Sequence, residues 1–335
     1  MKAIFYTKYG NPEVLQLKEV EKPVPKAHEV LVKIHAASIN SWDWDLLRGK
    51  PYLYRLLSGL LKPKLKILGA DIAGQVESVG ASVQKFKPGD AVFGDVSDSG
   101  WGGFAEYVRV HENALLLKPA ALSYEQAAAL PQASVLALQG IRDLKTVQAG
   151  DHVLINGAGG GVGTFALQIA KSIGAKVTAV DSAEKQEILL KLGTDHFIDY
   201  TTSDFTKNGQ KYDLIIDVIA QHSASAYVKS LQSGGALAIV GGRVATLLQI
   251  ASLGYFISKT GTKKLGFVLH KPNHGLDEIL KLIESGKIKP MIDKCYSLQN
   301  TPEAFQYFGA GKVKGKIIIN CLLEHPPQPE FAHIL

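Results

Sequence analysis

The spacing of apolar residues changes near residue 120 of this 335-residue chain. Before that point, short runs rich in valine and isoleucine are separated by glycine, proline and aspartate, as in "EVLVKIHAAS", "DIAGQVESVG", "DAVFGDV" and "FAEYVRV". Such runs between turn residues predict antiparallel strands of an irregular β-barrel. A last apolar run, "KGKIIINC", predicts that the C-terminal part returns to complete the same domain.

After residue 120, predicted strands and helices alternate. Ser123 and Gln126 have the spacing of a capping box, which opens a helical region that runs to about Lys145 with a break at Pro131. The further expected strands are 152–156, 176–180, 213–217 and 236–240, and the expected helices are 162–173, 183–192 and 222–231. This alternation predicts a doubly wound parallel sheet in an α/β chain. The expected domains are therefore residues 1–122 with 292–335, and an inserted domain at residues 123–291.

Composition narrows the class of protein. Hydrophobic residues make up 46% and charged residues 20% of the chain, which is enough apolar side chain for two folded cores. The net charge of +6 comes from scattered lysines rather than a basic run, so nucleic acid is not the expected partner. Two cysteines provide neither a disulfide framework nor a zinc cluster. We find no apolar run long enough for a membrane span or a signal peptide, and expect a cytoplasmic protein.

The segment "GAGGGVG" at residues 157–163 follows a predicted strand and opens a predicted helix. Gly157, Gly160 and Gly163 then allow a tight turn, a close approach by a pyrophosphate, and close helix packing, with Gly161 and Val162 in the same loop. The free N–H groups and the dipole of the helix N-terminus favour an anionic group there. Asp181 ends the next strand, where a carboxylate accepts hydrogen bonds from an adenosine ribose. The alternatives are a merely flexible turn for the glycines and a helix N-cap for Asp181.

Six separated motifs carry a resemblance that spans about residues 1 to 320. In order they are "GADIAGQVESVG", "KPGDAVFG", "GGFAEYV", "AAALPQASVLALQGI", "GAGGGVG" and "GKIKPMID". The chain resembles the medium-chain dehydrogenase/reductase superfamily, in its zinc-free branch of quinone oxidoreductases and enone or alkenal reductases. The resemblance implies a GroES-like catalytic domain, a Rossmann domain, a nicotinamide cofactor and a homodimer.

The chain departs from the zinc-dependent members of this superfamily at three positions. Asn40 stands where they carry cysteine, and Ala70 and Asp71 stand where they carry a His-Glu pair. Asparagine and alanine supply neither the thiolate nor the imidazole of a catalytic zinc site, so no zinc is expected. Without a Lewis acid, the easier hydride acceptor is a quinone or an alkene conjugated to a carbonyl, where hydrogen bonds stabilise the developing enolate.

Candidate catalytic residues are Asn40, Tyr52 and Tyr54. The Asn40 amide has a donor for a substrate carbonyl or for the nicotinamide ribose, or it is simply a turn residue. A phenol at Tyr52 or Tyr54 is a proton donor or oxyanion partner, or else a packing residue. Leu136 replaces the threonine that many relatives direct at the nicotinamide.

The resemblance also assigns cofactor contacts in the second half of the inserted domain. Gly241 and Gly242 let the backbone approach the nicotinamide carboxamide, and Asn273 lies in "LHKPN", the segment that closes over the cofactor. Asp181 favours NADH, whereas Lys185, helped by Ser182, favours the 2′-phosphate of NADPH if Asp181 turns outward. The cofactor is therefore expected to be NADPH or NADH.

The expected function is NAD(P)H-dependent reduction of quinones or α,β-unsaturated carbonyls. The alternatives are a scaffold protein of the same fold that has lost turnover and, less favoured, a zinc-dependent alcohol dehydrogenase. The apolar segments "ATLLQIASLGYFI" and "KKLGFVLH" read as a loop and an exposed edge strand that pair two subunits, or as the wall of a substrate site.

Overall fold

The computed structural model describes residues 1–328, and its internal contacts separate two units. Within the described residues, one unit comprises residues 1–132, 272–274 and 290–328, and the other comprises residues 133–271 and 275–289. The segment 290–328 thus belongs to the first unit. Residues 329–335, which the sequence also assigned to that domain, lie outside the described part.

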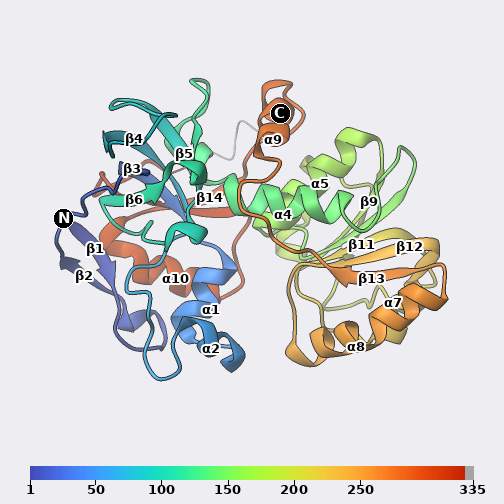
Figure 1. The fold of residues 1–335 in the computed structure, drawn as a ribbon. Coiled ribbons are helices and arrows are strands. Elements are labelled where there is room, and N and C mark those ends of the chain that lie inside the picture. Colours follow the sequence, from blue (N-terminus) through green and yellow to red (C-terminus); the bar gives the residue numbers. More distant parts are fainter. Residues whose placement is uncertain (329–335) are drawn as a thin grey trace. The chain divides into compact units, whose positions relative to one another are not determined.

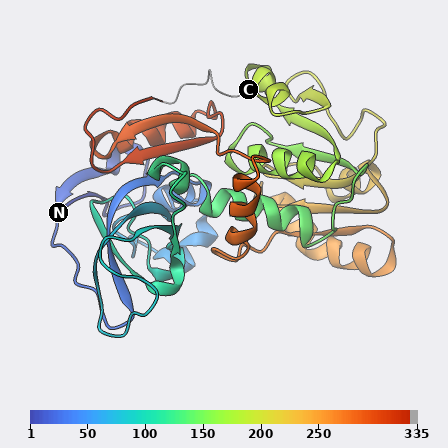
Figure 2. The same ribbon diagram turned by 90° about the horizontal axis from the view of Figure 1, so that it is seen from above.

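The first unit is built on a mostly antiparallel sheet of seven strands in the order β14-β15-β3-β4-β5-β7, with β6 paired to β3. In Figure 2 the red C-terminal strands lie beside the blue N-terminal ones, as the pairing of β15 with β3 requires. The strands of the sheet are β3 (Glu29–Ser38), β4 (Asp71–Val79), β5 (Ala91–Asp95), β6 (Tyr107–His111), β7 (Leu116–Leu117), β14 (Ile292–Ser297) and β15 (Lys316–Asn320), and a separate hairpin holds β1 (Lys2–Phe5) and β2 (Gln16–Glu19). The helices of this unit are α1 (Ser41–Arg48), α2 (Arg55–Ser58), α3 (Tyr124–Ala128) and α10 (Thr301–Gly309).

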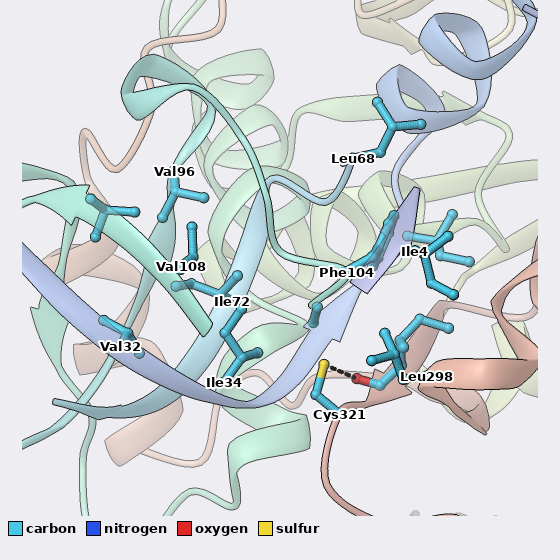
Figure 3. Packing of buried hydrophobic residues seen from close by; sticks show 14 of the residues in the cluster. Ile4, Val32, Ile34, Leu68, Ile72, Val96, Phe104, Val108, Leu298 and Cys321 are labelled. Atoms are coloured by element: carbon cyan, nitrogen blue, oxygen red, sulfur yellow. Dashed lines mark hydrogen bonds between the residues drawn. The ribbon is translucent and has the colours of Figure 1, made fainter. Parts of the chain in front are cut away.

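The core of this unit lies between the sheet and the segments that cover it. Ile34 and Ile72 from neighbouring strands are fully buried and pack in one cluster with Phe104 and Leu298 (Figure 3). Alternate residues of β3 and β4 supply this apolar face, because side chains along a strand point in turn to opposite sides. The sheet that carries Asp71 and Lys316, and that leads directly into Asn40, is therefore anchored by a well-filled core.

The second unit is a parallel sheet of six strands in the order β10-β9-β8-β11-β12-β13. Helix α5 covers one face of this sheet, and α7 and α8 lie over the opposite face (Figure 1). The strands are β8 (His152–Asn156), β9 (Lys176–Asp181), β10 (His196–Asp199), β11 (Tyr212–Asp217), β12 (Leu231–Ile239) and β13 (Lys264–Phe267). The helices are α4 (Pro131–Arg142), α5 (Gly161–Ile173), α6 (Gln186–Lys191), α7 (Ala224–Ser230), α8 (Val244–Thr260) and α9 (Leu276–Glu284).

The predicted doubly wound sheet is confirmed, and so is the capping box in which Ser123 and Gln126 bond reciprocally at the start of α3. Helix α3 packs on β3 and β4, and the contacts divide the chain after residue 132, while the domain boundary expected after residue 122 stays a prediction. The expectation of a loop at residues 245–257 is wrong, since this apolar run lies within helix α8. Its apolar residues surround the helix instead of forming one stripe, so the run has no helical periodicity to read.

Candidate functional site

The glycine loop between β8 and α5 has the geometry expected of a phosphate site. Gly157 has a positive φ of 82°, which favours glycine, and a Cβ on Gly163 would lie 2.2 Å from the carbonyl oxygen of Gly157. A Cβ on Gly160 would meet only that same oxygen, at 3.5 Å, so this side of the loop is open. The N–H groups of Gly161, Val162 and Gly163 form the first turn of α5 and have no acceptor within the helix. Free donors beside open space suit an anionic group.

Asp181, at the end of β9, is tied to this loop. Its Oδ2 accepts a hydrogen bond from the Gly159 N–H at 2.8 Å, and its Oδ1 accepts one from the Ser182 N–H at 2.9 Å. The Lys185 ammonium lies 3.2 Å from Oδ1, and both side chains of this ion pair are at least nine-tenths buried. Asp181 therefore does not turn outward in this structure. Nor does it cap a helix, because Ser182 is the N-cap of the short 3-10 turn Ala183–Lys185 that precedes α6.

The order of the strands places this loop at the point where the sheet reverses its direction of winding. The chain runs from β8 outward to β9 and β10, then returns to β11 on the other side of β8. In open α/β sheets, ligands bind outside the carboxyl ends of the strands at such a point. Here the ends are Asn156 and Asp217, which stand opposite each other in the register of β8 and β11.

Asp217 is the centre of a buried network that the sequence analysis missed. Its Oδ1 accepts a hydrogen bond from Asn156 Nδ2 at 2.9 Å, and its Oδ2 accepts one from the Tyr227 hydroxyl at 2.7 Å. Burial raises the pKa of Asp217 to about 6, although these hydrogen bonds act in the opposite direction. The network joins β8, β11 and α7 just below the carboxyl edge. A carboxylate ending the apolar strand "YDLIID" was the signal available in the sequence.

Gly241 and Gly242 follow β12 and lie against the segment that follows β11. A Cβ on Gly242 would come within 2.3 Å of the Ala220 carbonyl oxygen, and the Ala220 N–H donates to the Gly241 carbonyl at 2.9 Å. Close backbone packing alone therefore requires glycine at 242. The proposed approach of a carboxamide to this segment is an additional role.

Asn273 has a structural role within the first unit. Its backbone is in the left-handed region with φ of 61°, and its Oδ1 accepts from the Asp95 N–H at 2.8 Å. Its Nδ2 donates to the carbonyl oxygens of Asp95 at 2.8 Å and Ala114 at 3.2 Å. Both N–H groups of this amide are thus used by the chain itself, and a contact to a cofactor would have to come from the neighbouring backbone.

A second polar cluster lies in the first unit, where the end of β3 meets the starts of β4 and β15. Both neighbours run antiparallel to β3. Asp71 pairs with Ser38, and Lys316 lies two residues before Ile318, which also pairs with Ser38. Asn40 Nδ2 donates to Asp71 Oδ2 at 3.0 Å, and the Lys316 ammonium donates to Asn40 Oδ1 at 2.5 Å. The same ammonium lies 3.5 Å from Asp71 Oδ2. We call Asn40, Asp71 and Lys316 the amide cluster.

The surroundings of the amide cluster supply further donors to its carboxylates. Asp71 Oδ2 accepts from the Ser38 hydroxyl at 3.2 Å, and Asp71 Oδ1 accepts from the Gln132 N–H at 3.1 Å. Burial raises the pKa of Asp71 to about 6 and lowers the pKa of Lys316, while the attraction between the two groups opposes both shifts. Asp43 accepts from the backbone N–H groups of Asn40 and Gly69, both at 2.8 Å, and burial raises its pKa to about 7.

The two candidate tyrosines lie in the segment after α1. Tyr52 is 67% exposed, and the Arg55 guanidinium stands 4.9 Å from its ring centroid. Tyr54 is half-buried, and burial together with the charge of Asp45 raises its pKa. None of the described interactions links either phenol to the amide cluster, so the structure brings Asn40 together with Asp71 and Lys316 but not with the tyrosines.

Comparison with known proteins matches a protein-family model to each of the two units. The family described as "Alcohol dehydrogenase GroES-like domain" matches residues 26–120, and the one described as "Zinc-binding dehydrogenase" matches residues 192–319. The chain is 34% identical over 331 residues to 2-methylene-furan-3-one reductase of Solanum lycopersicum, covering 96% of this chain and 79% of the relative.

Solved structures give the same relationship. A quinone oxidoreductase from Coxiella burnetii has a TM-score of 0.85 at 29% identity, covering 96% of this chain and 99% of that one. The Escherichia coli quinone oxidoreductase complexed with NADPH has a TM-score of 0.82 at 25% identity, covering 96% of this chain and all 100% of that one.

A GroES-like unit joined to a Rossmann-type parallel sheet defines the class as a two-domain dehydrogenase or reductase. The chain belongs to the medium-chain dehydrogenase/reductase superfamily, in the branch that holds quinone oxidoreductases and alkenal/one reductases. Within residues 1–328, no three His, Cys, Asp or Glu side chains are grouped to hold a metal ion. In the same described range, no helix is long and apolar enough to cross a membrane.

Proposed function

We propose that the protein catalyses NAD(P)H-dependent reduction of quinones or α,β-unsaturated carbonyls without a catalytic metal. The observation that carries this proposal is that one chain contains both a dinucleotide-type glycine loop, at residues 157–163, and a buried polar site, the amide cluster of Asn40, Asp71 and Lys316. The relatives named above act as a quinone oxidoreductase and a furanone reductase, as their names state, which supports the same substrate class.

The second unit fits a nicotinamide dinucleotide. The pyrophosphate would lie at the open side of the loop at Gly160 and accept hydrogen bonds from the first-turn N–H groups of α5. The adenosine ribose would contact Asp181 and Lys185. Gly241, Gly242 and the segment around Asn273 are proposed to border the nicotinamide. The cofactor, when bound, supplies a hydride.

The donor set of the first unit suits an acceptor that needs no Lewis acid. A hydride adds to the β-carbon of an enone, the π electrons move to the carbonyl oxygen, and a proton then adds to the α-carbon. Asn40 would donate a hydrogen bond to the oxygen as negative charge develops there, which stabilises the transition state more than the ground state. We propose Tyr52 or Tyr54 as the source of the proton, because each carries a phenol in the segment after α1.

The test is steady consumption of NADPH and NADH by the purified protein with benzoquinone, methyl vinyl ketone and a medium-chain enal as acceptors. We expect turnover with at least one acceptor class and little oxidation of ethanol in the reverse direction. Cofactor binding without turnover for any acceptor would instead support the scaffold alternative.

We further propose that the protein is a homodimer located in the cytoplasm. Strand β13 is an edge of the parallel sheet, and an unpaired edge invites pairing with a second copy. Helix α8 packs beside β13 and exposes Leu248, Tyr255 and Phe256, each more than 60% accessible. Light scattering at micromolar concentration should give twice the mass of one chain. A monomer there would assign the exposed apolar residues of α8 to a substrate site instead.

A further inference from the structure

The side-chain amide of Asn40 is held between two opposite charges. The Lys316 ammonium stands 2.5 Å from its oxygen, and the Asp71 carboxylate stands 3.0 Å from its nitrogen. The three groups close a ring, because the ammonium also lies 3.5 Å from the same carboxylate oxygen. All three residues are at least nine-tenths buried, so little water screens these interactions.

These two charges allow the Asn40 side-chain amide only one orientation, with Oδ1 toward Lys316 and Nδ2 toward Asp71. A half-turn of the amide group would bring its NH₂ against the ammonium and its oxygen against the carboxylate. Both contacts would then be repulsive, and two buried charged groups would lose a hydrogen bond, which is costly in a low-dielectric interior. The assignment of Oδ1 and Nδ2 therefore follows from the charges of Lys316 and Asp71.

One N–H of the Asn40 amide remains uncommitted. Nδ2 carries two hydrogens, and the described interactions use one of them, for Asp71. Asn40 is 6% exposed, whereas Ser38 and Asp71 are completely buried. Asn40 is thus the member of this group that a ligand reaches most directly, with a donor still available.

We propose that Lys316 is a positioning residue that acts through Asn40. It fixes the amide so that the second N–H of Nδ2 is presented to the carbonyl oxygen of the substrate, and its charge withdraws electron density from the amide and strengthens that donor. Lys316 transfers no proton and touches no reacting atom in this role. The inference rests on the proposed function, since it names the residue that prepares the proposed oxyanion donor.

The competing explanation is that Lys316 only neutralises Asp71. The distances favour the first role, because the ammonium is 2.5 Å from the amide oxygen but 3.5 Å from the carboxylate oxygen. The two roles predict different behaviour when both charges are removed together. A Lys316→Met/Asp71→Asn variant keeps the buried site neutral and deprives the amide of the ammonium.

The kinetic test compares Lys316→Met, Asn40→Ala and their double variant with methyl vinyl ketone as acceptor. We expect each single change to lower kcat at least about tenfold while the cofactor Kd stays within about twofold. The double variant should lose no more than the worse single variant, because both act on one hydrogen bond. A Lys316→Met kcat within about twofold of wild type would overturn the inference, and so would losses that multiply.

Two further measurements keep the inference falsifiable. If Lys316→Met does not fold, Lys316→Met/Asp71→Asn takes its place and should still lose kcat; recovery of the wild-type kcat would show that Lys316 only neutralises Asp71. The second measurement is a crystal structure of whichever variant folds, which needs no turnover. The Asn40 amide should be rotated or disordered there, and an amide in its wild-type position would refute the inference. Because this readout is independent of activity, absence of turnover in the wild type would count against the proposed function alone.

Discussion

Replacing Asp181 tests how the protein recognises the ribose of its cofactor. In the structure the Asp181 carboxylate and the Lys185 ammonium are 3.2 Å apart and nearly buried, so together they present no net charge to a 2′-phosphate. Asp181→Ser leaves the ammonium without its partner, and a 2′-phosphate then meets a site of charge +1. We predict that this change raises the ratio of NADPH to NADH efficiency at least about tenfold, which corresponds to about 1.4 kcal/mol.

The size of this effect follows from the change of one unit charge near the phosphate. At about 4 Å, one pair of unit charges interacts by about 1 kcal/mol in water and by about 4 kcal/mol at the effective dielectric constant of a protein surface. A tenfold change lies near the lower end of this range. NADH efficiency should fall as well, because its 2′-hydroxyl loses the carboxylate as acceptor.

The assay is kcat/KM for each cofactor at a saturating acceptor concentration and fixed ionic strength. Asp181→Asn is the matched control, since its amide oxygen can still accept the Gly159 N–H bond that now measures 2.8 Å at Oδ2. Both variants should raise the ratio if the charge is the cause. A rise in Asp181→Ser alone would point to the shape of the loop, and equal ratios before and after both changes would show that Asp181 does not meet the ribose.

Three other predictions concern the glycine loop, the buried carboxylate and metal content. Gly163→Ala should lower both Tm and NADPH affinity, because its Cβ would lie 2.2 Å from the Gly157 carbonyl oxygen. Gly160→Ala should lower the affinity alone, because its Cβ would meet only that oxygen, at 3.5 Å. Thermal unfolding and a fluorescence titration with NADPH separate the two effects. The folded pKa of Asp217 is raised from 3.8 to about 6, so its stabilising contribution is complete below about pH 4 and lost as the pH rises through about 6, by at most about 3 kcal/mol. Denaturant titrations should therefore show a smaller penalty for Asp217→Asn at about pH 7.5 than at about pH 4.5, and an equal penalty would contradict the raised pKa. Elemental analysis should find less than stoichiometric zinc, because Asn40 and Ala70 supply no thiolate or imidazole; tightly bound zinc with loss of activity on chelation would refute this.

Features that depend on neighbouring residues could be predicted from the sequence. The glycine loop is one example, because Gly157 and Gly163 are needed for contacts within seven residues of each other. The alternation of strands and helices and the capping box at Ser123 are likewise local patterns. The domain boundaries at residues 122/123 and 291/292, and the functional roles of the candidate site residues, stay predictions.

Features that depend on strand register were missed. Lys316 lies 276 residues after Asn40 in the sequence, and only the antiparallel pairing of β15 with β3 brings the two level. The sequence did contain a signal, since Asp71 and Lys316 each begin a strand and are followed directly by buried apolar residues. Buried lysine and aspartate are rarely found without a partner, so opposite charges in two buried strands suggest an ion pair.

The two buried carboxylate networks differ in a way that separates structure from chemistry. Asp217 is completely buried, as is Tyr227, and its two oxygens accept from groups on two other elements, β8 and α7, which suits a clamp that holds the carboxyl edge of the sheet. Asp71 is equally buried, and its amide partner Asn40 is also held by the Lys316 ammonium. Asn156 Nδ2, like Asn40 Nδ2, makes one described hydrogen bond, so a spare N–H does not by itself separate the two networks. What separates them is the Lys316 ammonium, 2.5 Å from the Asn40 amide oxygen, because it orients the remaining N–H of Asn40. The amide cluster is therefore the first place to look for the substrate oxygen.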